Sequence, residues 1–363
     1  MGLFELRVEE LKRYLAQVFK GRVMDVSIGE LGSGGEGDLK GFGYGRPLAV
    51  RVNVDGHRRE VVLGTMRGDS FGHEFPYDRA HSLLMAYQTF NRLPRHVKAL
   101  DVGAVMGDGS LRSLGGFEEF FLLTEKVEGR EYYRDLERIK EAGTLTSMDE
   151  ERCVALSKYL VEVHGVKRGE PGLYRRRIRE LIGHGECVMG LVDNYPDDFK
   201  LLDVEGWRGL EHMWVEWRWR LRGKAHRLSR VHGDFHPWNI LFREGLDFTV
   251  LDRSRGEWGE PADDVAALTV NYLFYSLNTY GWLSGPFERL FKRFLSTYIE
   301  ETGDDEVLEV IQPFYAWRGL VLGSPVWYPN LSPEVRCKIF SFVRNVLGSE
   351  AFEVDEVNRY LES

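Results

Sequence analysis

The segment that most constrains the fold of this chain is residues 232–242, HGDFHPWNILF, in which polar and ionisable side chains stand between two short apolar runs. The run LSRV precedes the segment, and ILF ends it. We expect the polar residues to form a loop at the mouth of a sheet, where Asp234 can accept a proton from a hydroxyl. Asn239, five residues further on, can point an amide oxygen at a metal ion. This is the spacing of a catalytic loop for phosphoryl transfer.

A second carboxylate follows this loop at a distance that fits the same chemistry. Residues 246–251, LDFTVL, form a short β-prone run that ends immediately before Asp252. Asp252 lies thirteen positions after Asn239, and a hairpin of that size brings the amide and the carboxylate to one site. Magnesium prefers carboxylate, amide or water, and phosphate oxygens as ligands. The sequence therefore predicts a base and a metal site together.

These residues resemble those of a known family, the aminoglycoside phosphotransferases and choline kinases, which have a protein-kinase-like fold and phosphorylate small molecules. His232, Asp234 and Asn239 match the HxDxxxxN loop of that family. Asp252 matches the metal-binding aspartate that follows the loop after one strand. The resemblance implies that Asp234 is the catalytic base and that Asn239 and Asp252 hold Mg²⁺. It also implies that His232 belongs to the scaffold of the loop.

The resemblance extends to residues 259–266, GEPADDVA, which are similar to the G-D-P-x-x-D-[LV]-A segment of the family. This match implies that Asp264 braces the catalytic loop. One departure is that Arg253 and Ser254 follow Asp252, where the family has an aromatic and an acidic residue. The departure leaves the metal role intact and affects the substrate side of the site.

The resemblance also implies an α+β fold with two lobes. A small β-rich lobe with an antiparallel sheet, residues 1–129, is expected to bind the nucleotide. A larger, mostly helical lobe, residues 130–363, is expected to carry the catalytic loop and the acceptor site. The implied reaction is transfer of the γ-phosphoryl group of ATP, or of another NTP, to a hydroxyl of a small molecule, with Mg²⁺ as cofactor. An aminoglycoside-like compound, an amino alcohol or a sugar fits this description.

Three runs in the first lobe, VMDVSIGEL, RPLAVRVNV and HRREVVLGTMR, predict antiparallel strands after a helix over residues 3–19. The first two runs are separated by residues 31–45, which contain seven glycines. Such a segment lets backbone amides approach phosphate closely, so Gly32, Ser33 and Gly34 are expected to contact the nucleotide. The same composition is also typical of a flexible hairpin tip.

The third of these strands lacks the lysine that would pair with the α- and β-phosphates, because Gly64 stands at that position. Arg67, three residues further on, is the expected replacement, and Arg51 on the preceding strand is the alternative. Arginine binds phosphate well, although as a planar fork rather than a point charge.

Residues 118–129, EEFFLLTEKVEG, predict a buried strand and a polar turn at the hinge between the lobes. The backbone groups of Glu125 and Val127 are the expected contacts for the nucleotide base. Because such recognition uses main-chain groups, the sequence does not distinguish ATP from GTP.

Charge and cysteine content exclude several other classes of partner. The chain has 48 basic and 57 acidic residues, a net charge of −9 and no long basic block, so nucleic acid is not expected as a partner. The N-terminal helix carries charges throughout, and no stretch holds the ~20 apolar residues of a membrane span. Cys153, Cys187 and Cys337 have no metal-ligand spacing. We therefore expect a cytoplasmic protein without a membrane partner, and the oligomeric state stays open.

Two other functions remain open from the sequence. The missing lysine and the unusual residue after Asp252 favour a nucleotide-binding regulatory pseudokinase, whereas the retention of Asp234, Asn239 and Asp252 favours an enzyme. The His-x-Asp-x-His pattern of residues 232–236 also suits a hydrolytic zinc or iron site. The acidic run EETGDDE, residues 300–306, suits a cationic acceptor, but a run of this kind is usually a solvated turn between helices.

Overall fold

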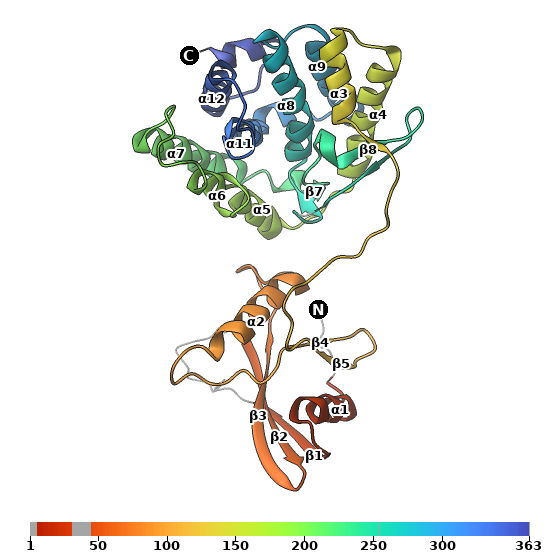
Figure 1. The fold of residues 1–363 in the computed structure, drawn as a ribbon, viewed down its shortest axis with the longest axis vertical. Helices are drawn as coiled ribbons and strands as arrows, with labels where there is room; N and C mark the ends of the chain where they lie inside the picture. The colour runs from red at the N-terminus through yellow and green to blue at the C-terminus, as the bar shows by residue number, and fades with distance from the viewer. Residues whose placement is uncertain (1–5, 31–44, 254, 363) are drawn as a thin grey trace. The chain divides into compact units, whose positions relative to one another are not determined.

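The computed structural model describes residues 6–30, 45–253 and 255–362. The chain divides into two compact units, Met1–Thr124 and Glu125–Ser363 (Figure 1). The loop residues Gly32, Ser33 and Gly34 lie outside the described residues. No described helix is long and apolar enough to cross a membrane.

The first unit is built around an antiparallel sheet with the strand order β1-β2-β3, as the sequence predicts. Asp55 and Gly56 connect β2 to β3, and both have positive φ, 52° and 87°. These angles suit a two-residue hairpin turn whose twist matches that of the strands. The helices and strands of this unit are α1 (Val8–Phe19), β1 (Val23–Glu30), β2 (Gly45–Val54), β3 (His57–Met66), α2 (Pro76–Phe90), β4 (Gly103–Val105) and β5 (Leu111–Ser113).

The core of the first unit forms between α1 and one face of the sheet. Leu11 and Leu15, one turn apart on α1, are buried together with Val50, Val52 and Val54 of β2. The three valines alternate along the strand and therefore point to the same face of the sheet.

The second unit is mostly helical, with a short sheet of order β6-β8-β9 and a two-stranded ladder of β7 and β10. Its first elements are β6 (Arg130–Glu131), α3 (Tyr133–Ala142), α4 (Ser147–His164), α5 (Pro171–Gly183), α6 (Val188–Asp193), α7 (Val204–Leu221) and η1 (Ala225–Arg227). Next come β7 (Ser229–Arg230), η2 (Pro237–Asn239), β8 (Ile240–Phe242), β9 (Phe248–Val250) and β10 (Trp258–Gly259). The last are α8 (Pro261–Tyr280), α9 (Gly285–Thr302), α10 (Val307–Val310), α11 (Gln312–Gly323), α12 (Pro333–Gly348) and η3 (Val354–Leu361).

Helix α8 forms the centre of the second unit (Figure 1). It is buried along most of its length and packs against α9 and α11, while α4 packs against α9 and α11 packs against α12. A helix buried on most sides needs apolar residues all round, and the α8 sequence PADDVAALTVNYLFYSL provides them after its first turn. The first turn carries Asp263 and Asp264, so α8 presents two carboxylates at its N-terminus.

The buried strand expected over residues 118–129 is not present. Residues 117–129 form no helix or strand, and the side chain of Phe121 is 91% exposed. An apolar run becomes a strand only where a neighbouring strand pairs with its backbone N–H and C=O groups. No strand among the described residues pairs with this run.

Candidate active site

The predicted catalytic loop connects β7 to β8 in the second unit. β8 pairs with β9 in antiparallel register, with Ile240 opposite Val250. The pairing continues one residue further, because the N–H of Leu251 donates to the carbonyl of Asn239 at 2.8 Å. The hairpin therefore brings Asp252, the next residue after Leu251, to the end of the loop that carries Asn239.

Asn239 is tied into the loop by its amide nitrogen. Nδ2 donates to the backbone carbonyl of Asp234 at 3.1 Å, and the backbone N–H donates to the carbonyl of His236 at 2.9 Å. Because Nδ2 is used within the loop, Oδ1 is the side-chain atom of Asn239 that can face a cation.

Asp252 has a backbone conformation that few residues adopt. Its φ is 55°, in the left-handed region, which asparagine and aspartate tolerate better than other non-glycine residues. The side chain is exposed and forms no hydrogen bond or ion pair with another described residue. The amide oxygen of Asn239 and this carboxylate fit Mg²⁺, which binds one or two carboxylates together with substrate phosphates. No group of three or more His, Cys, Asp or Glu that could hold a metal ion occurs in the described part of the chain.

Arg253, the departure from the family pattern, turns back onto the main chain. Its Nε and Nη2 donate to the carbonyl of Val231 at 3.0 and 2.7 Å, and Nη2 also donates to the carbonyl of Glu257 at 3.2 Å. Arg253 thus fixes the segment after β9 to the strand that enters the catalytic loop.

Asp264 lies under the start of the catalytic loop and is fully buried. Its two oxygens accept the backbone N–H groups of His232 and Gly233, both at 2.7 Å. Nε2 of His164, at the end of α4, lies 3.1 Å from the same carboxylate, and Nδ1 lies 2.8 Å from the hydroxyl of Tyr298. These contacts are the ones expected of a brace for the loop.

Two pKa shifts follow from this packing. Burial raises the pKa of Asp264, but the hydrogen bond from His164 and the nearby histidines outweigh it, so the pKa lies below its usual value. Burial lowers the pKa of His232, which keeps its ring neutral. A neutral ring can accept a hydrogen bond, and Nδ1 of His232 accepts the N–H of Asp234 at 3.2 Å.

Asp234 is surrounded by positive charge. Its Oδ1 lies 2.6 Å from Nη1 of Arg318 and 3.6 Å from Nη1 of Arg255, and Oδ2 lies 3.4 Å from Nε2 of His236. Burial opposes ionisation, but the hydrogen bond with His236 and the charges of Arg318 and Arg255 hold the pKa of Asp234 far below its usual value. The carboxylate therefore stays ionised at neutral pH.

Sequence reasoning did not find four of the residues that hold the site. His164, Asp263, Arg255 and Arg318 were not singled out. Arg318 lies in α11 and also donates to Asp263 at 2.9 Å. Burial raises the pKa of Asp263, although the two arginines lower it. The only sequence signal for these residues was the run DRSRG, residues 252–256, in which two arginines follow Asp252.

In the first unit, Arg67 directly follows β3 and is exposed, with no ion pair to another described residue. Arg51 instead bonds to Glu60 on the neighbouring strand at 2.8 Å. Asp78, on the helix after β3, accepts the N–H of Phe75 at 2.9 Å and caps α2. Of the two arginines, only Arg51 has an ion-pair partner among the described residues, so Arg67 is the better candidate to bind phosphate.

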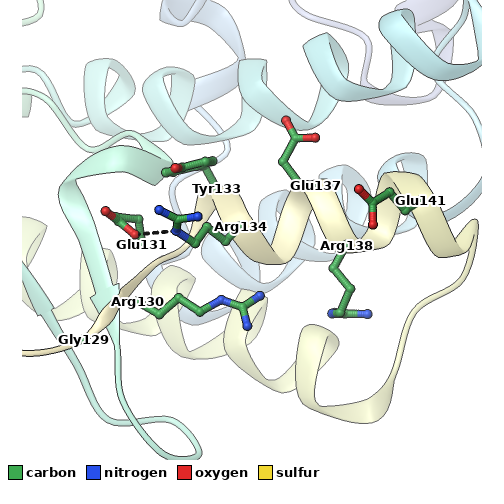
Figure 2. Close-up of a pocket in the computed structure, with 8 residues that line it drawn as sticks. All are labelled: Gly129, Arg130, Glu131, Tyr133, Arg134, Glu137, Arg138 and Glu141. Atoms are coloured by element: carbon green, nitrogen blue, oxygen red, sulfur yellow. Dashed lines mark hydrogen bonds and ion pairs between the residues drawn. The ribbon is translucent and has the colours of Figure 1, made fainter.

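Residues Glu125 and Val127 begin the second unit and lie outside any helix or strand. Close to them in the sequence, a cavity of about 680 Å³ opens along α3 (Figure 2). The ring of Tyr133 in its wall stacks on Trp238 of the catalytic loop, with centroids 5.2 Å apart. The cavity is lined by acidic and basic side chains in alternation, and none of the predicted site residues is among them. Its lining residues are Gly129, Arg130, Glu131, Tyr133, Arg134, Glu137, Arg138 and Glu141.

Comparison with known proteins places this site in a family. A model of the phosphotransferase enzyme family matches residues 73–302, more than half of the chain, including the whole catalytic loop. No curated protein is significantly similar in sequence.

Similar solved structures include kinases of small molecules. Ethanolamine kinase from Plasmodium vivax is 14% identical, with 93% of this chain and 80% of that chain covered and a TM-score of 0.37. Choline kinase from Streptococcus pneumoniae is 12% identical, with 94% and 98% covered and a TM-score of 0.36. Choline kinase from Cryptosporidium parvum is 11% identical, with 93% and 86% covered and a TM-score of 0.34.

The chain belongs to the phosphotransferase enzyme family. The resemblance to aminoglycoside phosphotransferases and choline kinases is thereby confirmed. The expected α+β, protein-kinase-like fold class is confirmed as well, with an antiparallel sheet in the first unit and a mostly helical second unit.

Proposed function

We propose that the chain is a small-molecule kinase that transfers the γ-phosphoryl group of ATP, or of another NTP, to a hydroxyl. The observation that supports this most is the convergence of Asp234, Asn239 and Asp252 at one end of the β8–β9 hairpin in a member of the phosphotransferase family.

Asp234 receives the acceptor hydroxyl and orients it toward the phosphoryl group. Its low pKa makes it a weak base in the free protein, so its contribution is mainly orientation, with proton uptake late in the reaction. His232 and Asp264 hold the loop that carries it. Positioning of this kind is the main task of a phosphotransferase, because little covalent chemistry falls to the protein.

Asn239 and Asp252 are the proposed magnesium ligands. When bound, Mg²⁺ neutralises charge on the phosphates of the nucleotide. The other proposed nucleotide contacts are backbone and side-chain groups of Gly32, Ser33, Gly34, Arg67, Glu125 and Val127.

The metal role of Asp252 can be tested without knowing the acceptor. Asp252→Ala should weaken binding of AMP-PNP in the presence of Mg²⁺ by tenfold or more and leave metal-free binding unchanged. Isothermal titration calorimetry with and without Mg²⁺ measures both. Asp247→Ala is the matched control, because this exposed aspartate lies on the same hairpin and, among the described residues, its side chain pairs only with Arg243. Parent-like binding by Asp252→Ala would refute the assignment.

Turnover separates an enzyme from a regulatory pseudokinase. We expect ADP release when the protein, Mg²⁺ and ATP are combined with a panel of hydroxyl-bearing metabolites and antibiotics. Binding of the magnesium nucleotide without ADP release from any compound would favour the pseudokinase.

A further inference from the structure

Three arginines from separate parts of the second unit converge on the catalytic loop. Arg177 is in α5, Arg318 is in α11, and Arg255 lies between β9 and β10. Arg318 and Arg255 both approach Oδ1 of Asp234, at 2.6 and 3.6 Å. Arg177 lies beside the segment of Arg255, because its Nη2 would lie 2.6 Å from a Cβ placed on Gly256, the residue after Arg255.

An aromatic ring fixes two of these arginines in place. The guanidinium carbons of Arg255 and Arg318 lie 4.3 and 4.0 Å from the ring centroid of Trp317, which is 1% exposed. Cation–π contact of this kind holds a guanidinium by its face and leaves the N–H groups at its edge free for other partners.

The cluster contains more buried hydrogen-bond donors than acceptors. Leaving a buried donor unpaired is unfavourable, and more so for a charged group. Every unpaired atom of the cluster is a hydrogen-bond donor, so a partner for them must be rich in acceptor oxygens. The unpaired buried nitrogens of this cluster, counted against the described residues, are Nε and Nη2 of Arg177, Nε and Nη1 of Arg255, Nε of Arg318 and Nε1 of Trp317.

The carboxylates near these arginines already form ion pairs. Arg318 bonds to two of them, at 2.6 and 2.9 Å. Arg177 donates through Nη1 to Glu180 at 2.6 Å, which leaves its other nitrogens. Arg255 has no carboxylate of a described residue within hydrogen-bonding distance. The described residues therefore offer no further carboxylate to Arg177 and Arg255.

We propose that Arg177 and Arg255 bind an anionic group, a carboxylate or a phosphate, of the acceptor itself. The proposal rests on the kinase function proposed above. The acceptor hydroxyl is the group that Asp234 receives, and Arg255 stands beside that carboxylate. The charge of the transferred phosphoryl group, by contrast, would be met by Mg²⁺ held by Asn239 and Asp252.

Two carboxylates of the acidic run, residues 300–306, already have cationic partners within the fold. Both oxygens of Asp304 bond to Arg227, at 2.6 and 2.9 Å. Glu306 bonds to Lys224 at 2.7 Å and to Arg227 at 3.2 Å. These carboxylates are neutralised within the fold.

The first test measures binding of inorganic phosphate to the full chain by calorimetry, at constant ionic strength and without nucleotide or Mg²⁺. The parent should bind phosphate, and Arg177→Gln and Arg255→Gln should each weaken binding at least tenfold. Arg179→Gln, an exposed arginine on the same helix, should bind like the parent. Absence of binding by the parent, or equal binding by all variants, would overturn the proposal.

The same titration in saturating Mg²⁺–AMP-PNP distinguishes a site for the anionic group of the acceptor from a site for the transferred phosphoryl group. Phosphate should still bind, because the nucleotide occupies a different site. Loss of phosphate binding would show that the arginines serve the transferred phosphoryl group, which contradicts the proposal. Arg177→Lys and Arg255→Lys keep the charge and replace the glutamine variants if those do not fold. Each lysine variant should bind phosphate more tightly than the glutamine variant of the same residue.

Turnover provides an independent test with matched pairs of hydroxyl compounds, such as glycerate with glycerol and serine with serinol, assayed for ADP release. Turnover should favour the anionic member, and Arg255→Gln should raise its KM at least tenfold with a smaller change in kcat. Preference for the neutral or cationic member would refute the anion site and leave the kinase function standing. Phosphate binding without turnover of any compound would refute the kinase function and leave the anion site standing.

Discussion

The pKa of Asp234 depends on residues outside the catalytic loop. Arg318, 84 positions further along the chain, makes the shortest ion pair to it and is itself buried. Burial lowers the pKa of Arg318, but the charges of Asp263 and Asp234 raise it above its usual value, so the guanidinium stays charged. One cation therefore pairs with two carboxylates, Asp234 of the catalytic loop and Asp263 of α8.

Removal of Arg318 should leave those two carboxylates without their main partner. We expect Arg318→Gln to lower the free energy of unfolding by about 3–5 kcal/mol, because breaking a buried ion pair strands the remaining charge. Urea denaturation followed by circular dichroism measures this, with the exposed Arg179→Gln as control. An unfolding midpoint within error of the parent would show that the pair contributes little.

The sequence predicted Asp234, Asn239 and Asp252 as a set because they lie in one hairpin, where strand register alone brings them together. The roles of these residues stay predictions. The contacts of His164 and Arg318 could not be predicted, because each depends on how distant helices pack. A lone histidine at a helix end and a lone arginine in an apolar helix have many possible partners until the fold is known.

At the level of elements, the catalytic loop is held by helices on two sides. His164 at the end of α4 links Asp264 of α8 to Tyr298 of α9, and all three side chains are buried. Asp264 in turn accepts two backbone N–H groups at the start of the loop. Its position therefore depends on a contact between three helices.

His164→Ala should remove both bonds and leave a cavity. We expect the free energy of unfolding to fall by about 2–3 kcal/mol, since a buried carboxylate and a buried hydroxyl each lose a partner. The kcat should fall while nucleotide affinity stays the same. Thermal unfolding and ADP release measure the two effects, and His212→Ala on the exposed face of α7 is the control. Unchanged stability would argue against the brace.

Elements with a local signal were predictable, and those that need a distant partner were not. Helix α4 begins where Thr146 and Asp149 form a capping box, and the β2–β3 hairpin turns at Asp55 and Gly56. Both signals lie within a few residues. Residues 118–129 have the composition of a strand, but pairing depends on a neighbour that the segment itself does not specify.

For the whole molecule, a network of ion pairs predicts acid sensitivity. Glu306 bonds to Lys224, His226 and Arg227, and Arg227 also bonds to Glu260 at the start of α8. Burial raises the pKa of Glu306, but the hydrogen bonds from these bases outweigh it and lower the pKa to about 2. Protonation of Glu306 therefore weakens its bonds to Lys224, His226 and Arg227.

The sign of the pH effect follows from this shift. An unfolded glutamate has a pKa of about 4.3, so between about 2 and about 4.3 the unfolded chain binds more protons than the folded chain. The free energy of unfolding should therefore rise with pH across this window and fall as the solution is acidified. Glu306→Gln should flatten the rise, as measured by urea denaturation from pH 2 to 5. If the free energy of unfolding rises as steeply with pH in Glu306→Gln as in the parent, other carboxylates cause the pH dependence.

The central claim, that Asp234 directs phosphoryl transfer, is tested most directly by Asp234→Asn, which keeps the shape of the side chain and removes its charge. Once an acceptor is known, kcat should fall by about 10² to 10⁴, the usual size of general-base and positioning effects, while AMP-PNP affinity changes little. Circular dichroism must show that the variant is folded. Full turnover by folded Asp234→Asn would contradict the mechanism.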